Sequence, residues 1–168
     1  MDRPPLFKLS AQLSNRRSPV KLRTSVPYDH TELASLNSPI ATNNRCTRAS
    51  GTKWYDFVQL YDSFQFAISD RVRVALRTEG ITGWDSIALD IPEAPTTYHL
   101  FFPTSKAGPI LNLEALNNYG TEILEFDLGT WDGKDVFSLH ETTFIICTGR
   151  VRQVLEAIKA TNTEIGPL

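Results

Sequence analysis

The chain has 168 residues, 41% of them hydrophobic and 10% aromatic, which is enough apolar material for one folded domain and excludes an intrinsically disordered chain. Its apolar clusters are too short to cross a bilayer and its first residues lack a signal-peptide pattern, so we expect a cytoplasmic protein with no membrane partner. The net charge of −2 hides an asymmetry: residues 1–55 carry nine Lys and Arg against three Asp and Glu, whereas residues 56–168 carry eight against sixteen.

Residues 1–53 are rich in Pro, Ser, Asn and Thr, and their prolines are expected to interrupt any long helix or central strand. We therefore expect this segment to form a loop-rich N-terminal arm packed on the rest of the chain. The opposite charges of the arm and the body favour that packing, although an acidic body also suits a basic partner. Both interpretations stay open.

Residues 54–91 carry the first clear periodic pattern. The aromatic and β-branched stretch at 54–61 predicts a strand, and residues 64–68 alternate with period two as a half-buried strand does. Ser69 is a candidate N-cap for the helix that follows. Residues 84–91 predict a further strand.

Residues 92–134 contain four prolines around a predicted strand at 98–102, and then a second predicted strand at 123–128. Residues 135–147 predict a strand, a turn and another strand. Thr148 is a candidate N-cap for a final helix with a clean amphipathic stripe.

The two strand-turn-strand-helix units align without a gap when residues 56–85 are placed against residues 135–164. Seven of the 30 aligned positions are identical, and elsewhere turn replaces turn and cap replaces cap, as where Ser69 aligns with Thr148. We interpret the units as two diverged copies of one sequence. The predicted fold class is therefore α+β, with a single body at 54–168 that contains the repeat and an arm at 1–53 packed on it.

Both units place two arginines in the first turn of their helix, where the helix dipole disfavours positive charge. Each unit also begins with an aspartate. We predict structural ion pairs in which an arginine of each unit binds the aspartate of the same unit or of its counterpart. The residues concerned are Asp56, Arg71, Arg73, Asp135, Arg150 and Arg152. An anion site at Arg71 and Arg73 is the functional alternative.

No catalytic or metal-binding motif is complete. His140-Glu141 lacks the second histidine that a zinc-protease helix needs four residues later, because Phe144 stands there. Cys46 and Cys147 belong to no CxxC pair and are expected to be free thiols. We predict no enzyme activity, no cofactor and no metal site. An enzyme with dispersed catalytic residues stays the alternative.

Between residues 112 and 141, seven acidic residues stand against one lysine, and Trp131 lies among them. A tryptophan in an acidic, Gly-flanked turn is typical of a protein-binding hot spot, although it can equally plug the core. The acids could hold a cation, but a solvated loop is the simpler interpretation. The acidic body would repel phosphate, so we expect no nucleic-acid partner. The predicted partner-binding residues are Glu122, Glu125, Asp127, Trp131, Asp132 and Asp135.

Three segments carry a resemblance to a known family: WDGKDVF at 131–137, which leads into an apolar strand and the Thr148-capped helix, FAISDRV at 66–72, and GITG at 80–83. They resemble immunity proteins of bacterial polymorphic-toxin systems, in the group related to the double-CxxCG-motif proteins. This chain lacks both CxxCG motifs, so a zinc ribbon is not implied.

The resemblance implies a non-enzymatic bacterial protein that binds and neutralises a cognate toxin in interbacterial competition. The acidic body suits a toxin with a basic surface, because opposite charges speed association. The alternative function is another intracellular interaction or regulatory module, such as a phage or secretion-system accessory protein. A homodimer stays open as a further partner.

Overall fold

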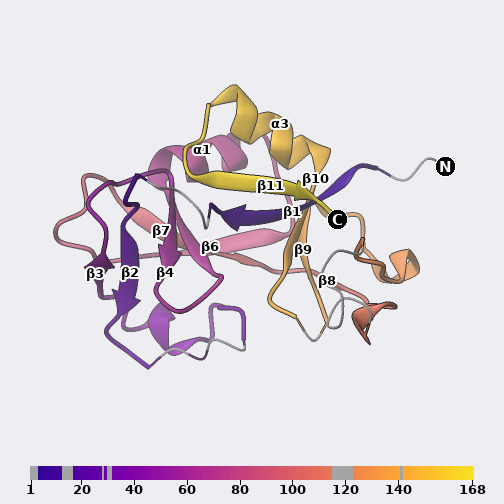
Figure 1. Cartoon of the computed structure of the whole chain (residues 1–168), viewed down its shortest axis with the longest axis horizontal. Coiled ribbons are helices and arrows are strands. Elements are labelled where there is room, and N and C mark those ends of the chain that lie inside the picture. Colours follow the sequence, from indigo (N-terminus) through magenta and orange to yellow (C-terminus); the bar gives the residue numbers. More distant parts are fainter. Residues whose placement is uncertain (1–3, 13–16, 28, 30–31, 115–122, 141) are drawn as a thin grey trace.

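The computed structural model of the chain describes residues 4–12, 17–27, 29, 32–114, 123–140 and 142–168. Within these residues, eleven strands form two sheets, and two α-helices lie together on one side of the molecule (Figure 1). The predicted α+β class is confirmed.

The first sheet has five strands in the order β11-β1-β10-β9-β8. Strand β1 lies between β11 and β10 and pairs antiparallel with both, whereas β8 pairs parallel with β9. Every residue of β9 and β10 is buried, as expected for strands that are covered on both faces. The bounds are β1 Leu6–Ala11, β8 Lys106–Ala107, β9 Val136–Leu139, β10 Ile145–Thr148 and β11 Thr163–Pro167.

The second sheet has six strands in the order β3-β2-β4-β5-β7-β6. Its two edges meet, because the Cys46 N–H at the start of β3 donates to the carbonyl of Asp90, just after β6. Arg45 adds an ion pair of 2.7 Å to Asp90. The sheet therefore curls around its own apolar core. The bounds are β2 Lys21–Thr24, β3 Cys46–Ser50, β4 Phe57–Leu60, β5 Phe66–Ser69, β6 Trp84–Ala88 and β7 Tyr98–Pro103, with the 3-10 turns η1 Pro39–Ala41 and η2 Leu128–Thr130.

Helices α1 (Asp70–Thr78) and α3 (Gly149–Ala157) each begin directly after a buried strand. Helix α1 buries Val72 and Leu76, and α3 buries Val151 and Leu155, at the i, i+4 spacing of one helical face. These side chains join residues of both sheets in one apolar cluster, so the helices hold the two sheets together. In the described part of the chain, no helix is long and apolar enough to cross a membrane.

The elements of the two predicted repeat units correspond in the register of the sequence alignment. Strands β4, β5 and β6 and helix α1 begin and end at the positions that align with the ends of β9, β10, β11 and α3. The pairings correspond as well, because β1 pairs with β10 and β11 as β7 pairs with β5 and β6. Strand β8 pairs parallel with β9 as β2 does with β4. A common origin of the two units stays a prediction.

The N-terminal segment differs from the loop-rich arm that we expected at residues 1–53. Strand β1 is an internal strand of the first sheet, and β2 and β3 belong to the second. The prolines of this segment lie between the strands, so they do not interrupt them: Pro4 and Pro5 precede β1, and Pro39 begins η1. The segment is therefore an integral part of both sheets.

Candidate functional site

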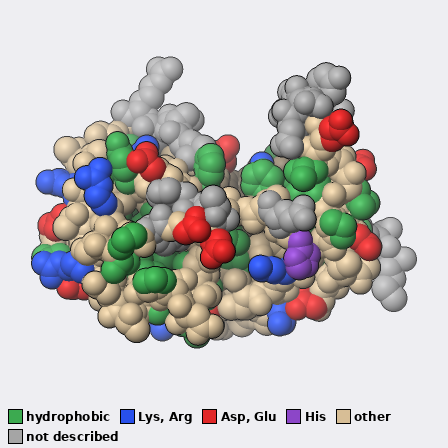
Figure 2. Space-filling view, turned by 90° about the horizontal axis from the view of Figure 1, so that it is seen from below, with side chains coloured by type: hydrophobic (Ala, Val, Ile, Leu, Met, Phe, Trp, Pro, Cys, Tyr) green, Lys and Arg blue, Asp and Glu red, His purple; other side chains and the backbone are tan. Residues whose placement is uncertain are grey.

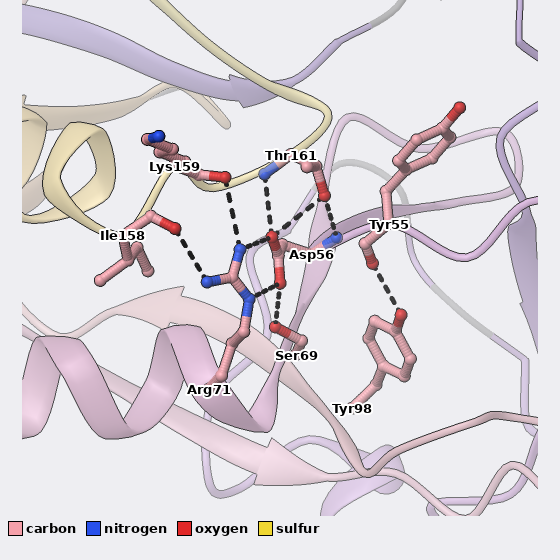
Figure 3. A network of polar contacts seen from close by, with 8 residues as sticks. All are labelled: Tyr55, Asp56, Ser69, Arg71, Tyr98, Ile158, Lys159 and Thr161. Carbon is pink, nitrogen blue, oxygen red and sulfur yellow. Dashed lines mark hydrogen bonds and ion pairs between the residues drawn. The ribbon is translucent and has the colours of Figure 1, made fainter.

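Asp56 lies directly before β4 at the centre of a network of polar contacts (Figure 3). Its buried carboxylate accepts five hydrogen bonds, from the Ser69 hydroxyl at 2.7 Å, the Arg71 guanidinium, and the N–H and hydroxyl of Thr161. Burial raises the pKa of Asp56, but the hydrogen bonds from Arg71, Ser69 and Thr161 outweigh burial and lower the pKa below its ordinary value.

The Arg71 side chain links the two helices. Its Nε lies 2.8 Å from Asp56 Oδ1, and its terminal nitrogens donate to the carbonyls of Ile158 at 2.8 Å and Lys159 at 3.3 Å, just after α3. The side chain starts near the N-terminus of α1 and ends at the C-terminus of α3, where the helix dipole favours positive charge. This contact offsets the unfavourable position of Arg71 in its own helix.

Asp135 repeats this arrangement in the second unit. Its carboxylate accepts hydrogen bonds from the Thr148 hydroxyl at 2.9 Å, from Arg150 at 2.8 Å, and from the N–H and hydroxyl of Thr82 at 3.1 Å. Arg150 also donates to the carbonyl of Glu79 at the end of α1. Each aspartate is therefore held by its own unit and by a threonine of the other unit.

The structure contains the two same-unit ion pairs that we expected, made by Arg71 and Arg150. The other two candidate arginines pair within their own helices: Arg73 approaches Asp70 at 3.8 Å and Arg152 binds Glu156 at 2.7 Å. The assignment of Asp135 to the partner-binding surface is wrong, because its carboxylate is buried and fully engaged. These networks join the two units and belong to the fold.

Ser69 and Thr148 occupy the predicted N-cap positions, but their hydroxyls do not cap the helices. Each hydroxyl donates to the aspartate of its unit instead. A buried carboxylate needs several donors, and its hydrogen bonds are charge-assisted, so it outcompetes the helix terminus for these hydroxyls.

The predicted strand at 123–128 is not a regular strand in the structure, where the acidic region forms a single antiparallel bridge between described residues. Ile110 pairs with Phe126, and the N–H of Leu111 donates to the carbonyl of Glu125 at 2.8 Å. The Asn112 side chain bonds to the backbone of both Ile123 and Glu125. Two separate chain segments thereby fix one another.

Side chains of residues 123–127 alternate between exposed and buried with the period of a strand. Leu124 and Phe126 are buried in an apolar cluster, whereas Ile123, Glu125 and Asp127 are exposed. Ile123 is 70% exposed and the neighbouring Leu111 is 64% exposed. We define the acidic loop surface as Leu111, Ile123, Glu125, Asp127, Leu128 and Asp132.

Trp131 lies next to Asp132 and packs on the apolar cluster. The residue is partly buried, and its ring centroid lies 5.5 Å from that of the buried Phe137. Its indole N–H donates to the carbonyl of Lys134 at 3.0 Å. Trp131 therefore packs against the apolar cluster with one side and holds the turn that follows it.

Asp132 caps the same turn, accepting from the Lys134 N–H at 3.1 Å and forming an ion pair of 3.3 Å with the Lys134 ammonium. Burial raises the pKa of Asp132, but the N–H and the ammonium of Lys134 favour the charged carboxylate, and the pKa lies below its ordinary value. Glu125, Asp127 and Asp132 are exposed, as a partner-binding role requires, and Glu122 lies outside the described residues.

The sequence-based assignment missed the exposed apolar residues Leu111, Ile123 and Leu128. The sequence predicts a strand over residues 123–128, and the alternation of Ile, Leu, Glu, Phe and Asp within it contains the signal. Because odd and even positions face opposite sides, either Ile123 or Leu124 must leave the core. The pairing of Phe126 with Ile110 decides that Ile123 is the exposed one.

Figure 2 shows the molecule from the side opposite the helices, with Lys and Arg prominent at its left end and Asp and Glu along the rim of the right end. The basic end contains β2 and β3, which carry Lys21, Arg23 and Arg48. The opposite end contains the acidic loop surface. On this face, Lys and Arg therefore gather more at one end, and Asp and Glu more at the rim of the other.

A scan of the chain against protein-family models found no match, and a search of curated proteins found none either. Among the described residues, no group of three or more His, Cys, Asp and Glu side chains is arranged to hold a metal ion.

A groove of about 810 Å³ lies between the sheets and residues 32–36. Its described lining includes Phe102, Leu139 and the hydroxyl of Ser138, and its titratable members are Glu32 and Lys106. The groove is wide enough for a small ligand, and its lining is mixed in polarity.

Proposed function

We propose that this protein is an immunity-type inhibitor that binds and neutralises a cognate bacterial protein toxin through the acidic loop surface, with no catalysis of its own. The observation that carries the proposal is the exposure of Leu111 and Ile123 beside Glu125 and Asp127 on two segments that are hydrogen-bonded to each other. An apolar centre with a charged rim is the composition of a protein-binding site.

The target that fits this surface is a protein with a basic patch around an apolar contact point. The carboxylates of Glu125, Asp127 and Asp132 would steer a basic target and raise the association rate. Burial of Leu111 and Ile123 would then slow dissociation, because most affinity differences within one interface lie in the dissociation rate. The resemblance to immunity proteins supports a toxin as that target, and such an inhibitor would act in the cytoplasm.

The first experiment is co-purification with a toxin encoded next to this gene, followed by measurement of affinity and kinetics. Ile123→Ser should weaken binding at least about tenfold, mainly through faster dissociation. Glu125→Lys should lower the association rate at low salt and flatten its dependence on salt. The matched controls are Val74→Ser in α1 and Glu79→Lys at its end, which replace an exposed apolar and an exposed acidic residue far from the acidic loop surface and should leave binding unchanged.

The proposal fails if no neighbouring toxin binds with sub-micromolar affinity. It also fails if a toxin binds but the controls weaken binding as much as the changes at Ile123 and Glu125. In the second case immunity would persist and the acidic loop surface would not be its site.

A further inference from the structure

The groove of about 810 Å³ between the sheets and residues 32–36 has a fixed outer wall. The buried Gln65 side chain holds this wall: its amide oxygen accepts from the Ala34 N–H at 2.9 Å, and its amide nitrogen donates to the Glu32 carbonyl at 2.7 Å. Ala34 is buried in the apolar core of the second sheet, and residues 35–38 close a turn by hydrogen bonds among themselves. The groove is therefore preformed, as ligand sites usually are.

Two polar side chains converge on the opposite wall of the groove. Lys106 of β8 and Ser138 of β9 are direct partners in the parallel pairing of these strands, so their side chains are neighbours on one face, and both line the groove. The Lys106 ammonium has no ion-pair partner among the described residues. Ser138 is 1% exposed, and its hydroxyl makes one contact of 3.5 Å to the Ser105 carbonyl, at the limit of hydrogen bonding. An unpaired ammonium beside a weakly engaged hydroxyl offers two donors to a carboxylate.

The rest of the described lining favours an apolar ligand body. Phe102 is buried at the groove, and Leu33 and Leu36 line it from the outer wall. Leu36 is 60% exposed, so an apolar ligand that covers it removes apolar surface from water. Glu32, the acid in the described lining, disfavours a second negative charge on the ligand. The groove therefore suits one carboxylate joined to one apolar body.

We propose that this groove binds a small monocarboxylate with an apolar body, such as a medium-chain fatty acid. The Lys106 ammonium and the Ser138 hydroxyl both donate to the carboxylate. The apolar body lies over Phe102 and reaches Leu36 on the outer wall. The groove shares no residue with the acidic loop surface, so this site is independent of toxin binding and stands whether or not the chain binds a toxin.

The test is a titration of octanoate into the full chain, followed through the amide signals in NMR spectra. Octanoate should shift the amides of residues 102–106 and 138–139, and the shifts should saturate at millimolar concentration or below. Octanol has the same chain without the charge and should bind at least about tenfold more weakly, because it loses the charge-assisted hydrogen bonds. Suberate, the dicarboxylate of the same length, should also bind more weakly, since its second charge is repelled by Glu32.

Two substitutions at exposed positions separate the polar from the apolar part of the site. Lys106→Met should weaken octanoate binding about tenfold and should make octanoate and octanol bind alike. Leu36→Ser should weaken the binding of both probes about three- to tenfold, because less apolar surface is buried. Both side chains are exposed in the free protein, so the fold should be unchanged. The matched control is Lys53→Met, which removes an exposed lysine between β3 and β4 and should bind octanoate as the wild type does.

The proposal is overturned if octanoate causes no saturable shifts at the groove, or if octanol binds as tightly as octanoate. It is also overturned if Lys106→Met binds octanoate as tightly as the wild type, or if Lys53→Met weakens binding as much as Lys106→Met does.

Discussion

Replacement of Asp56 by Ala should destabilise the protein more than replacement of its partner Arg71 by Ala. Asp56→Ala leaves the buried Ser69 hydroxyl and the part-buried N–H and hydroxyl of Thr161 without their acceptor, and it removes the counter-charge of Arg71. Unsatisfied buried donors and a broken ion pair of this kind cost about 3 kcal/mol. Arg71→Ala leaves Asp56 with its three other hydrogen bonds.

Arg71 is 52% exposed, so solvent screening limits its contribution, and its loss should cost about 1–2 kcal/mol. Urea unfolding of both variants, with an unchanged m-value, measures the difference. The melting temperature of Asp56→Ala should fall by about 6–12 °C for a chain of this length. Asp135→Ala and Arg150→Ala should show the same ranking.

An Asp56→Ala variant as stable as the wild type would refute this ranking, and so would a larger cost for Arg71→Ala than for Asp56→Ala. Glu125→Gln is the matched control, because this exposed acid should leave stability unchanged. A ranking that holds in one unit and reverses in the other would show that the two networks are not equivalent.

Burial is the largest cause of the high pKa of both thiols, about 11 for Cys46 and about 12 for Cys147. Neither thiol should therefore react with a thiol reagent at neutral pH until the protein unfolds, and rapid labelling of the native protein would contradict this. Burial also lowers the pKa of His99. The contribution of His99 to the free energy of unfolding should be complete above the ordinary histidine pKa near 6.5 and should decline as the pH falls below it. In unfolding measured at several pH values, His99→Gln should flatten this dependence on pH. Gly83→Ala should cost about 2–4 kcal/mol in urea unfolding, because φ is +84° and the new Cβ would lie 2.1 Å from the Val136 carbonyl oxygen; a cost below about 1 kcal/mol would show that the backbone there can relax.

Local patterns predicted the parts of the fold that depend on local order. The alignment of the two units and their strand-turn-strand-helix order could be predicted from hydrophobic periodicity and from the positions of the residues before each helix. Both are short-range signals that extend over one or two helical turns. Asp56 and Arg71 were paired correctly because they lie within one unit. The contributions of Thr82 and Thr161 could not be predicted, since each comes from the other unit and depends on how the units pack.

Counting charges along the chain was a poorer guide to the candidate site. Asp135 belongs to the run of acids, yet it lies at the start of a buried strand and faces inward. Trp131 and Glu125 have opposite environments because one packs on Phe137 and the other lies on the exposed side of residues 123–127. Which member of such a run reaches solvent is decided by pairing with a distant segment, here residues 108–112.

The place of β1 in the first sheet also governs the order in which the protein can assemble during translation. Leu6 pairs with Thr148 and Phe7 with Pro167, so β1 leaves the ribosome long before either neighbour exists. At about 5–20 residues per second, β10 follows β1 by roughly 7 to 27 seconds. The second sheet, β2 to β7, can pair within that interval, while β1 must wait unpaired. Contacts of such long range predict slow folding and make the waiting strand a natural target for a chaperone.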